Sequence, residues 1–492
     1  MRLSSKSLAL LPATVEQPRY DRSAIRTGIV HLGVGAFTRA HQAVYLDDVL
    51  GRGDLGWGIA AASLRSPDVR DALAPQDGLY SVAVRSGGGT ALRVIGSVGE
   101  VLVAPEGAAA LVARMSDPAV RIVTLTVTEK GYCHDPASGE LDEAHPDILH
   151  DLGAPHAPRS TPGLLVAALA ARKAAGVLPF TVLTCDNLPT NGVTVKRVLA
   201  RFAALCSDDL SAWVVGEVAC PSTMVDRIVP ATTTEDKAAI STSLGLEDAW
   251  PVVTEPFTQW VVEDHFPAGR PDLEAVGVQM AADVTPFEHM KLRLLNASHS
   301  AMAYLGYLGG YETIAETIAD AAFARYVRAM MDKEVSPTLS IPAGVDLAAY
   351  KDDLIARFRN PMLRHHTWQI AMDGSQKLPQ RILGTIRQRL ATDALFPRLA
   401  LAVAGWMRYA AGADERGLPI DVRDPLADML RRTANAVGPS PERLAPALLG
   451  VIEIFGSDLP ADPRFREAVT QALATLTRQG ALRAVGMLGT GS

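Results

Sequence analysis

A short stretch in the second half of the chain, Lys291-Leu-Arg-Leu-Leu-Asn296-Ala-Ser-His299, places an amine, a carboxamide and an imidazole close together. The surrounding residues from Met290 to Tyr307 contain no proline and are strongly apolar, which predicts a helix. On an α-helix with about 100° per residue, Lys291, His299 and Asn296 would lie at roughly 0°, 80° and 140°. The three polar side chains are therefore expected within one broad arc of the helix.

These residue types suit the interconversion of a carbonyl and an alcohol. The reaction needs a proton donor near the oxygen and neutral donors that hold the developing alkoxide charge. A partly buried lysine can serve as that proton donor because burial lowers the pKa of an amine, and Asn and His can orient the substrate. A surface lysine with two polar neighbours fits the spacing as well, so the segment alone leaves both interpretations open.

A second candidate motif, His31-Leu-Gly33-Val-Gly35-Ala-Phe37-Thr38, follows the apolar run from Gly28 to Leu32 and precedes a helix expected from Thr38 to Leu50. Gly33 permits a tight turn, and Gly35 lets a pyrophosphate approach the backbone at the helix N-terminus. A methyltransferase that uses S-adenosylmethionine would have a similar turn. The motif thus predicts a nucleotide site without choosing the reaction.

The end of the second expected strand, Trp57 to Leu64, bears on the cofactor. An acidic residue there would bind the ribose hydroxyls of NAD, whereas a basic residue could hold the 2′-phosphate of NADP. The candidates are Arg65 and Asp68, which favour opposite cofactors, and Asp68 could equally be a residue of the first helical turn. The choice between NAD and NADP stays open at this point.

The elements that must position these motifs change in character along the chain. Further strands are expected at Val120 to Val127 and Leu178 to Thr184, with a helix from Gly163 to Lys173 between them, and this alternation predicts a parallel, doubly wound sheet. From about Pro286 onward the sequence predicts mainly helices, at 291–307, 315–333, 380–391, 397–411 and 463–479. We therefore expect a Rossmann-type domain in residues 1–285, a mainly α-helical domain in 286–492, and a substrate cleft between them.

Composition limits the function classes. The chain has 492 residues, of which 48% are hydrophobic and 21% charged, and its net charge of -7 includes no basic block, so nucleic acid is not an expected partner. No run approaches the roughly 20 apolar residues that span a bilayer, and the N-terminus lacks a convincing signal peptide, so we expect a cytoplasmic protein. The four cysteines form no CxxC pair and the histidines show no ligand spacing, which predicts free thiols and no metal. The short-chain dehydrogenase pair, Tyr followed four residues later by Lys, is also missing.

Several blocks together resemble the polyol-specific long-chain dehydrogenase family, which contains mannitol 2-dehydrogenases and fructuronate reductases (D-mannonate oxidoreductases). The matching blocks run from about Gly28 to Arg381 and are HLGVGAFTRAHQAVYLDDVL, TLTVTEKGY, TCDNLPTNG, PSTMVDRIVP, EPFTQWVVED, KLRLLNASHS and DGSQKLP. The resemblance implies metal-independent chemistry with NAD(H) as the main cofactor. It also favours a catalytic lysine at position 291 over a surface lysine with two polar neighbours.

The resemblance assigns roles residue by residue. Lys291 would be the general acid in reduction and the general base in oxidation, with Asn187 and Asn296 as an oxyanion hole and His299 beside the substrate. Glu129 would connect the proton to solvent. Asp226, Glu288 and Lys377 fall on substrate-pocket positions, although Asp226 could simply pair with a base and Glu288 could be a helix-start charge. The implied cofactor residues are Gly33, Gly35, Ala36, Phe37 and Arg39, while Thr38 stands where many relatives carry histidine.

The segment from Arg364 to Arg381 is expected to select the substrate. Mannitol dehydrogenases would carry an arginine where this chain has Gln369, and TWQIAMDGSQKLPQR resembles the fructuronate reductase branch. A uronate needs a cation for its carboxylate, for which Lys377 is the first candidate and Arg364 and Arg381 are the next. The leading hypothesis is NADH-dependent interconversion of D-fructuronate and D-mannonate. The alternatives are a mannitol or arabinitol 2-dehydrogenase and a non-catalytic NAD(H) sensor. The oligomeric state does not follow from the sequence.

Overall fold

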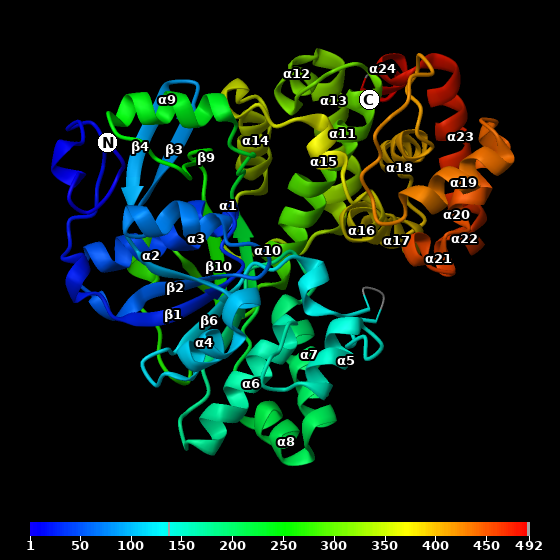
Figure 1. Ribbon diagram of the computed structural model, residues 1–492. Coiled ribbons are helices and arrows are strands. Elements are labelled where there is room, and N and C mark those ends of the chain that lie inside the picture. The colour runs from blue at the N-terminus through cyan, green and yellow to red at the C-terminus, as the bar shows by residue number, and fades with distance from the viewer. Residues whose placement is uncertain (136–137, 490–492) are drawn as a thin grey trace. The chain divides into compact units, whose positions relative to one another are not determined.

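The computed structural model describes residues 1–135 and 138–489 and divides the chain into two compact units, Met1–Thr285 and Pro286–Ser492 (Figure 1). The first unit contains every named strand of the described residues, and the second is built from helices. This division into a sheet-containing part and a helical part agrees with the fold class expected from the sequence.

The centre of the first unit is a five-stranded parallel sheet with the order β5-β2-β1-β6-β7. Its strands are β1 (Thr27–Leu32), β2 (Gly58–Ser63), β5 (Val98–Val103), β6 (Ile122–Leu125) and β7 (Thr181–Thr184). Most residues of β1, β2, β6 and β7 are buried, because helices cover both faces of a parallel sheet and apolar side chains are needed on each. The four strands predicted from apolar runs are confirmed as β1, β2, β6 and β7; β1 begins one residue earlier than expected, and the other three are shorter at one end or both.

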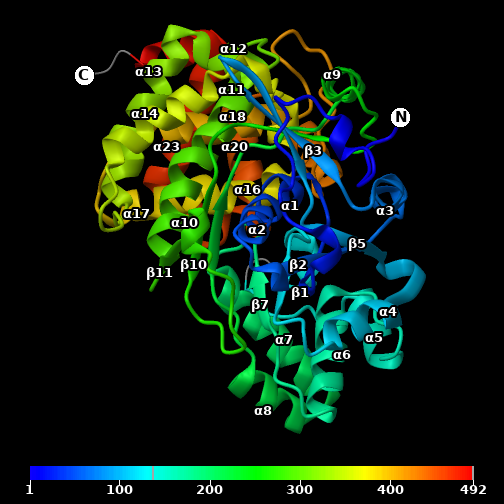
Figure 2. The same cartoon turned by 90° about the vertical axis from the view of Figure 1, so that its left-hand side faces the viewer.

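Helices connect the parallel strands and cover the sheet, and Figures 1 and 2 both show β1 beside β2 within it. The helices of this unit are α1 (Ala36–Ala40), α2 (Gln42–Gly51), α3 (Asp68–Leu73), α4 (Ala104–Ser116), α5 (Pro146–Gly153), α6 (Thr161–Ala174), α7 (Asn191–Cys206), α8 (Asp208–Glu217) and α9 (Thr234–Leu244). Short 3₁₀ turns occur at η1 (Leu8–Leu10), η2 (Arg22–Ala24), η3 (Leu55–Trp57), η4 (Ala74–Gln76), η5 (Glu129–Tyr132) and η6 (Glu274–Val276). The helix expected from Thr38 to Leu50 is two helices, since the backbone of His41 (φ -125°, ψ -90°) leaves helical geometry between α1 and α2.

Two small sheets were not predicted. In one, β3 (Tyr80–Ser86) pairs antiparallel with β4 (Gly89–Ile95) and parallel with β9 (Val252–Thr254). In the other, β10 (Gln259–Glu263) lies between β8 (Thr223–Asp226) and β11 (Gln279–Ala281). The expectation of a single sheet is therefore corrected to one parallel sheet with two smaller mixed sheets.

The second unit is helical, and its described residues contain no named strand. Its α-helices are α10 (Thr285–Met290, which starts one residue before the unit), α11 (Ala297–Leu308), α12 (Ile314–Ala319), α13 (Ala321–Ala329), α14 (Leu347–Phe358), α15 (Thr367–Ala371), α16 (Gly374–Leu378), α17 (Gly384–Ala391), α18 (Pro397–Ala410), α19 (Ala427–Val437), α20 (Pro441–Leu449), α21 (Ile452–Phe455), α22 (Asp458–Ala461), α23 (Pro463–Gln479) and α24 (Ala481–Gly489). Three further segments wind as π-helix, η7 (Lys291–Asn296), η8 (Met330–Val335) and η11 (Pro379–Leu383), and 3₁₀ turns lie at η9 (Ser336–Thr338) and η10 (Pro361–Leu363). None of the helices in the described residues is both long and apolar enough to cross a membrane.

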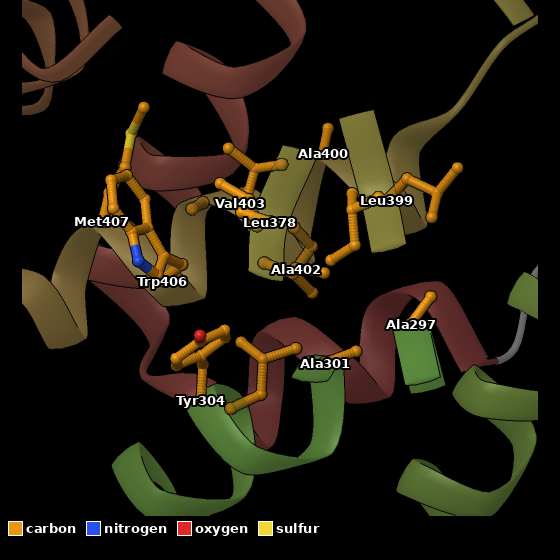
Figure 3. Packing of buried hydrophobic residues seen from close by; sticks show 14 of the residues in the cluster. Ala297, Ala301, Tyr304, Leu378, Leu399, Ala400, Ala402, Val403, Trp406 and Met407 are labelled. Carbon is orange, nitrogen blue, oxygen red and sulfur yellow. The ribbon is translucent and has the colours of Figure 1, made fainter. Parts of the chain in front are cut away.

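The core of this unit is the contact between α11 and α18, which lie next to each other in Figure 2. Figure 3 shows Ala297 and Ala301 of α11 facing Leu399 and Ala402 of α18, with Tyr304 near Trp406 at the other end of the contact. All of these side chains are buried. Small residues on the facing side let the two helices approach closely, so α11 is held firmly by its packing.

Candidate active site

The first predicted motif forms a turn at the carboxyl end of β1. Gly33 has a φ of +94°, and a Cβ built on it would lie 2.1 Å from the carbonyl oxygen of Thr126. Only glycine fits there, because other residues are strained at this φ and the neighbouring backbone leaves no space. Gly35 is the N-cap of α1 and is exposed, and a Cβ on it would meet nothing nearer than 3.9 Å. The turn is thus closed at Gly33 and open at Gly35, as a close approach of a ligand to the backbone requires.

Arg39 is placed differently from the sequence expectation. Its side chain is buried, its Nε donates to the carbonyl oxygen of Gly35 at 3.1 Å, and its Nη1 donates to that of Trp250. Burial lowers the pKa of its guanidinium to about 10. These hydrogen bonds let Arg39 support the glycine turn from inside, and its expected contact with the cofactor stays a prediction. Phe37 is half-buried with its ring stacked on His41 at 5.0 Å, and Ala36 begins α1.

His31 connects the glycine turn to the end of β6, the neighbouring strand in the sheet, and the sequence did not indicate this role. Its Nδ1 lies 2.7 Å from Oγ1 of Thr124, and its Nε2 lies 2.9 Å from Oγ1 of Thr126. The Thr126 hydroxyl in turn donates to the carbonyl oxygen of Gly33 at 2.7 Å. Burial lowers the pKa of His31 to about 4, so the ring is neutral at physiological pH. A neutral histidine thus joins the ends of β1 and β6.

Asn187 lies exposed in the loop after β7, next to Asp186. This loop is anchored by Asn191 at the start of α7, whose Nδ2 donates to the carbonyl oxygens of Asp186 (3.1 Å) and Thr223 (2.9 Å). The Asn191 Oδ1 accepts the amide of Thr223 at 3.0 Å. One buried carboxamide therefore connects the Asn187 loop to β8.

Glu129 begins the 3₁₀ turn η5 after β6 and is half-buried. The residue before it, Thr128, has φ 63° and ψ 164°, a region that is almost restricted to glycine and is strained for threonine. Asp226 is the last residue of β8 and is buried. Asn187 and Glu129 thus follow neighbouring parallel strands of this unit, where such sites commonly form.

In the second unit, Lys291 and Asn296 bound the π-helix η7, inside a helix that continues from α10 into α11. Both side chains are buried, as is Glu288 on α10. The angles calculated from about 100° per residue do not apply here, because a π-helix bonds i to i+5 and winds more widely than an α-helix. Such π segments occur frequently at functional sites.

His299 is the third residue of α11, and its side chain is buried. Its ring contacts Phe358 at 4.6 Å and, edge to face, His365 at 5.4 Å between centroids. Within the described residues, His299 Nε2 and His365 Nδ1 are both buried without a hydrogen-bond partner. Burial is the main reason that the pKa of His299 lies well below its ordinary value, and His365, Arg381, Arg357 and Lys377 lower it further. His365 was not singled out from the sequence.

The three basic residues of the 364–381 segment that could bind a carboxylate differ in their burial and in their contacts. Lys377 on α16 is half-buried, and its Nζ donates to the carbonyl oxygens of Met372 (2.6 Å) and Ile370 (3.3 Å). Arg381 in η11 is half-buried and donates from Nη1 to Oγ of Ser300 at 3.1 Å. Arg364 is exposed and has a φ of 45°. Since η11 contacts η7, the structure brings Arg381 near the Lys291 helix and gives Arg364 no comparable place.

The two residues that bear on the cofactor lie after β2. Arg65 and Asp68 are both exposed, and Asp68 is the first residue of α3, where its Oδ2 accepts the hydroxyl of Ser66 at 2.9 Å. The first-turn interpretation of Asp68 is thus confirmed. Among the described residues, no group of three or more His, Cys, Asp or Glu side chains could hold a metal ion, and the four cysteines are unpaired.

Comparison with known proteins agrees with this fold and these motifs. Residues 27–275 match the family described as the mannitol dehydrogenase Rossmann domain, and residues 283–477 match the mannitol dehydrogenase C-terminal domain. The chain therefore belongs to the mannitol dehydrogenase family of oxidoreductases.

Individual relatives are similar over nearly their full length. The chain is 50% identical to an uncharacterized oxidoreductase, YeiQ, of Escherichia coli (96% of this chain, 97% of the relative). It is 48% identical to the D-mannonate oxidoreductase of the same organism (96% and 98%). Among solved structures, the Pseudomonas fluorescens mannitol 2-dehydrogenase in ternary complex with NAD and D-mannitol matches with a TM-score of 0.94 and 41% identity over 99% of each chain.

Proposed function

We propose that this protein is an NAD(H)-dependent oxidoreductase that interconverts D-fructuronate and D-mannonate, with Lys291 as the acid and base. Family membership supports carbonyl–alcohol chemistry, and the relative named D-mannonate oxidoreductase supports a sugar acid as substrate. The observation that carries the choice of an acid is a pair of cationic side chains close to His299 in the second unit. Arg381 donates to the hydroxyl of Ser300, the residue after His299, and Arg381 and Lys377 both act on the His299 ring as nearby positive charges.

A carboxylate is the substrate group that such surroundings favour. The guanidinium of Arg381 and the amine of Lys377 are both half-buried, and a cation in that environment binds a carboxylate more strongly than an exposed one does. Gln369 stands where a mannitol dehydrogenase is expected to carry arginine. We therefore assign the substrate carboxylate to Lys377 and Arg381, and we place Arg364 outside this role because its side chain is exposed.

The remaining residues receive the following roles. Lys291 gives a proton to the keto oxygen in reduction and removes it from the hydroxyl in oxidation. The carboxamides of Asn296 and Asn187 donate to the same oxygen as negative charge develops on it. His299 is neutral and orients a hydroxyl of the sugar, Glu129 passes the proton to solvent, and Asp226 and Glu288 contact the substrate.

NAD(H) fits the residues of the first unit. When bound, it supplies or accepts the hydride at the sugar carbon. Gly35 leaves the backbone at the N-terminus of α1 open to a pyrophosphate, and Gly33 gives the turn its shape. The NAD in the Pseudomonas fluorescens complex supports the choice of NAD over NADP.

A second candidate is oxidation of an uncharged polyol, which the similarity to mannitol 2-dehydrogenase favours. The test is steady-state kinetics on D-mannonate, D-altronate and D-mannitol, each with NAD and NADP. The highest kcat/KM is expected for D-mannonate with NAD. If mannitol is oxidised at least as efficiently, the uronate assignment fails, and NADH binding without any turnover would instead indicate a sensor.

A further inference from the structure

Asp186 occupies a junction in the first unit that no role assigned so far explains. It lies between the end of β7 and Asn187, and its carboxylate contacts the loop after β6, almost sixty residues earlier in the chain. Oδ2 accepts the amide of Val127 at 2.9 Å and the hydroxyl of Tyr132 at 2.7 Å, and Oδ1 accepts the amide of Thr128 at 3.1 Å. One carboxylate therefore holds three donors of the loop that contains Glu129.

The backbone that this carboxylate holds is strained. Thr128 has φ 63° and ψ 164°, which a threonine keeps only where the surroundings determine its conformation. The amide of Thr128 and the amide before it are the two that Asp186 accepts. The Tyr132 hydroxyl holds the other end of η5 against the same carboxylate. The hydrogen bonds of Asp186 thus bracket Glu129 on both sides along the chain.

We propose that Asp186 is a positioning residue, whose carboxylate keeps the strained loop at Thr128 in place and so fixes Glu129 relative to Asn187. The proposal rests on the proposed function for the roles of Glu129 and Asn187. Asp186 itself need not touch the substrate or the cofactor. Its backbone is fixed separately, because Asn191 donates to its carbonyl oxygen. Loss of the carboxylate would therefore release the loop after β6 while leaving Asn187 anchored.

The ionisation of Asp186 adds a pH dependence to this arrangement. Burial and, to a smaller extent, Glu129 raise its pKa to about 6, against the opposing effect of the donors Tyr132, Val127 and Thr128. Two neighbours do not change charge near pH 6, because burial raises the pKa of Tyr132 well above its ordinary value and that of Cys185 to about 12. Protonation removes acceptor sites from the carboxylate, so the loop is held above about pH 6 and loosened below it.

The matched control is Asp320, in the second unit. Its carboxylate accepts two backbone amides, of Ala322 (2.7 Å) and Phe323 (3.2 Å), and a tyrosine hydroxyl, of Tyr311 (2.9 Å). Asp320 therefore accepts hydrogen bonds from the same kinds of donor as Asp186, but it is not adjacent in the chain to Asn187 and does not hold the loop of Glu129. Asp320→Asn should weaken the second unit and leave the shape of the pH profile unchanged.

The experiment compares the wild type with Asp186→Asn, Asp186→Glu, Tyr132→Phe and Asp320→Asn in D-fructuronate reduction from pH 5 to 8. Asp186→Asn should lower kcat by roughly 10- to 100-fold, because small displacements of positioned groups have effects of that order. Its KM and its affinity for NADH should change by less than about threefold, since neither ligand is contacted. In the wild type, kcat should fall below about pH 6. This fall should be absent in Asp186→Asn and should return in part in Asp186→Glu. In Tyr132→Phe the pH at which kcat falls should be shifted.

Hydrogen–deuterium exchange gives a readout that does not depend on turnover. Exchange of the amides from 126 to 132 should rise in Asp186→Asn and stay at the wild-type level in Asp320→Asn. Unchanged exchange together with an unchanged acid limb of kcat would overturn the proposal. A wild type that reduces no sugar would instead contradict the proposed function, while the exchange measurement would still decide whether Asp186 holds the loop.

Discussion

At the scale of single residues, the proposed chemistry depends on Lys291, a lysine that is almost fully buried in a π-helix. Lys291 lies in the second unit, so its replacement should remove the proposed proton donor without opening the nucleotide turn in the first unit. Lys291→Ala should lower kcat by about 10²- to 10⁴-fold, the range expected for loss of a general acid. NADH affinity, measured by fluorescence titration, should change by less than about threefold.

Chemical rescue separates this role from a structural one. In D-mannonate oxidation, where the lysine acts as the base, a small primary amine added to Lys291→Ala should restore part of the lost turnover, and the gain should increase with pH as more of the amine becomes unprotonated. Retained activity of the variant without any added amine would remove the mechanism. The NADH titration also serves as the control for folding.

The basic residues of the 364–381 segment should distinguish acids from neutral sugars. Lys377→Met and Arg381→Met should each raise KM for D-fructuronate by roughly 10- to 100-fold, as expected for loss of one charge-assisted hydrogen bond. KM for D-fructose, which has no carboxylate, should change little. Arg432→Met is a control for net charge, because Arg432 lies exposed on α19. An equal rise of KM for both ketoses would show that these residues only support the fold.

At the scale of elements, the two glycines of the first turn should behave differently. Gly33→Ala introduces a side chain at φ +94° and within 2.1 Å of a carbonyl oxygen, so the variant should lose about 2 kcal/mol or more of unfolding free energy. Gly35→Ala has open space and an ordinary φ of -80°, so its thermal midpoint should stay near that of the wild type. It should bind NADH roughly tenfold more weakly or worse, because the methyl group occupies the approach of the pyrophosphate. Thermal unfolding and NADH titration of both variants test this contrast, which equal effects on both quantities would contradict.

The elements show what can be predicted from a sequence and what cannot. Apolar runs bounded by turn residues predicted β1, β2, β6 and β7, because buried parallel strands need such runs. The β3–β4 hairpin was missed although Gly87 and Gly88 separate two strand-like segments, so a signal was present there. The π winding of η7 has no such signal, since its apolar sequence suits an α-helix equally well.

The candidate site also contains residues that the sequence predicted and residues for which it gave no signal. The family blocks predicted roles for Lys291, Asn296, His299 and Asn187. Supporting residues such as His31, Asn191 and Asp186 have no such signal, because they contact residues far along the chain. The Asp186–Val127 hydrogen bond, for example, joins two loops that only strand order brings together. The resemblance implied a cofactor contact for Arg39, and the sequence did not indicate the hydrogen bonds that its guanidinium makes to the backbone of Gly35 and Trp250.

At the scale of the whole molecule, buried histidines should make the protein sensitive to acid. Burial lowers the pKa of His31 in the first unit and of His365 in the second to about 4. Between about pH 6.5 and 4 the unfolded chain therefore binds protons that the folded chain does not, and the unfolding free energy falls as the pH falls. His31, which is 2% exposed, contributes roughly 3 kcal/mol to this loss. Asp186 acts in the opposite direction, because its raised pKa lets the folded state take up a proton first.

Urea unfolding at pH 7 and pH 5 measures the net effect of the buried histidines and Asp186 on the free energy of unfolding. The wild type should be less stable at pH 5, and His31→Gln should show a smaller difference between the two pH values. His156→Gln is the control, since His156 is exposed in the same unit. The same pH dependence in His31→Gln as in the wild type would contradict the assignment to His31.

The π-helix η7 also affects how this family should be compared. A π segment holds one more residue per turn than the α-helix around it, so gaining or losing a single residue there would rotate everything that follows. Asn296 and His299 would then point elsewhere, although two aligned sequences would differ by only one gap. For chains of this family, the number of residues between Lys291 and His299 therefore says more about a shared active site than the percentage of identical residues does.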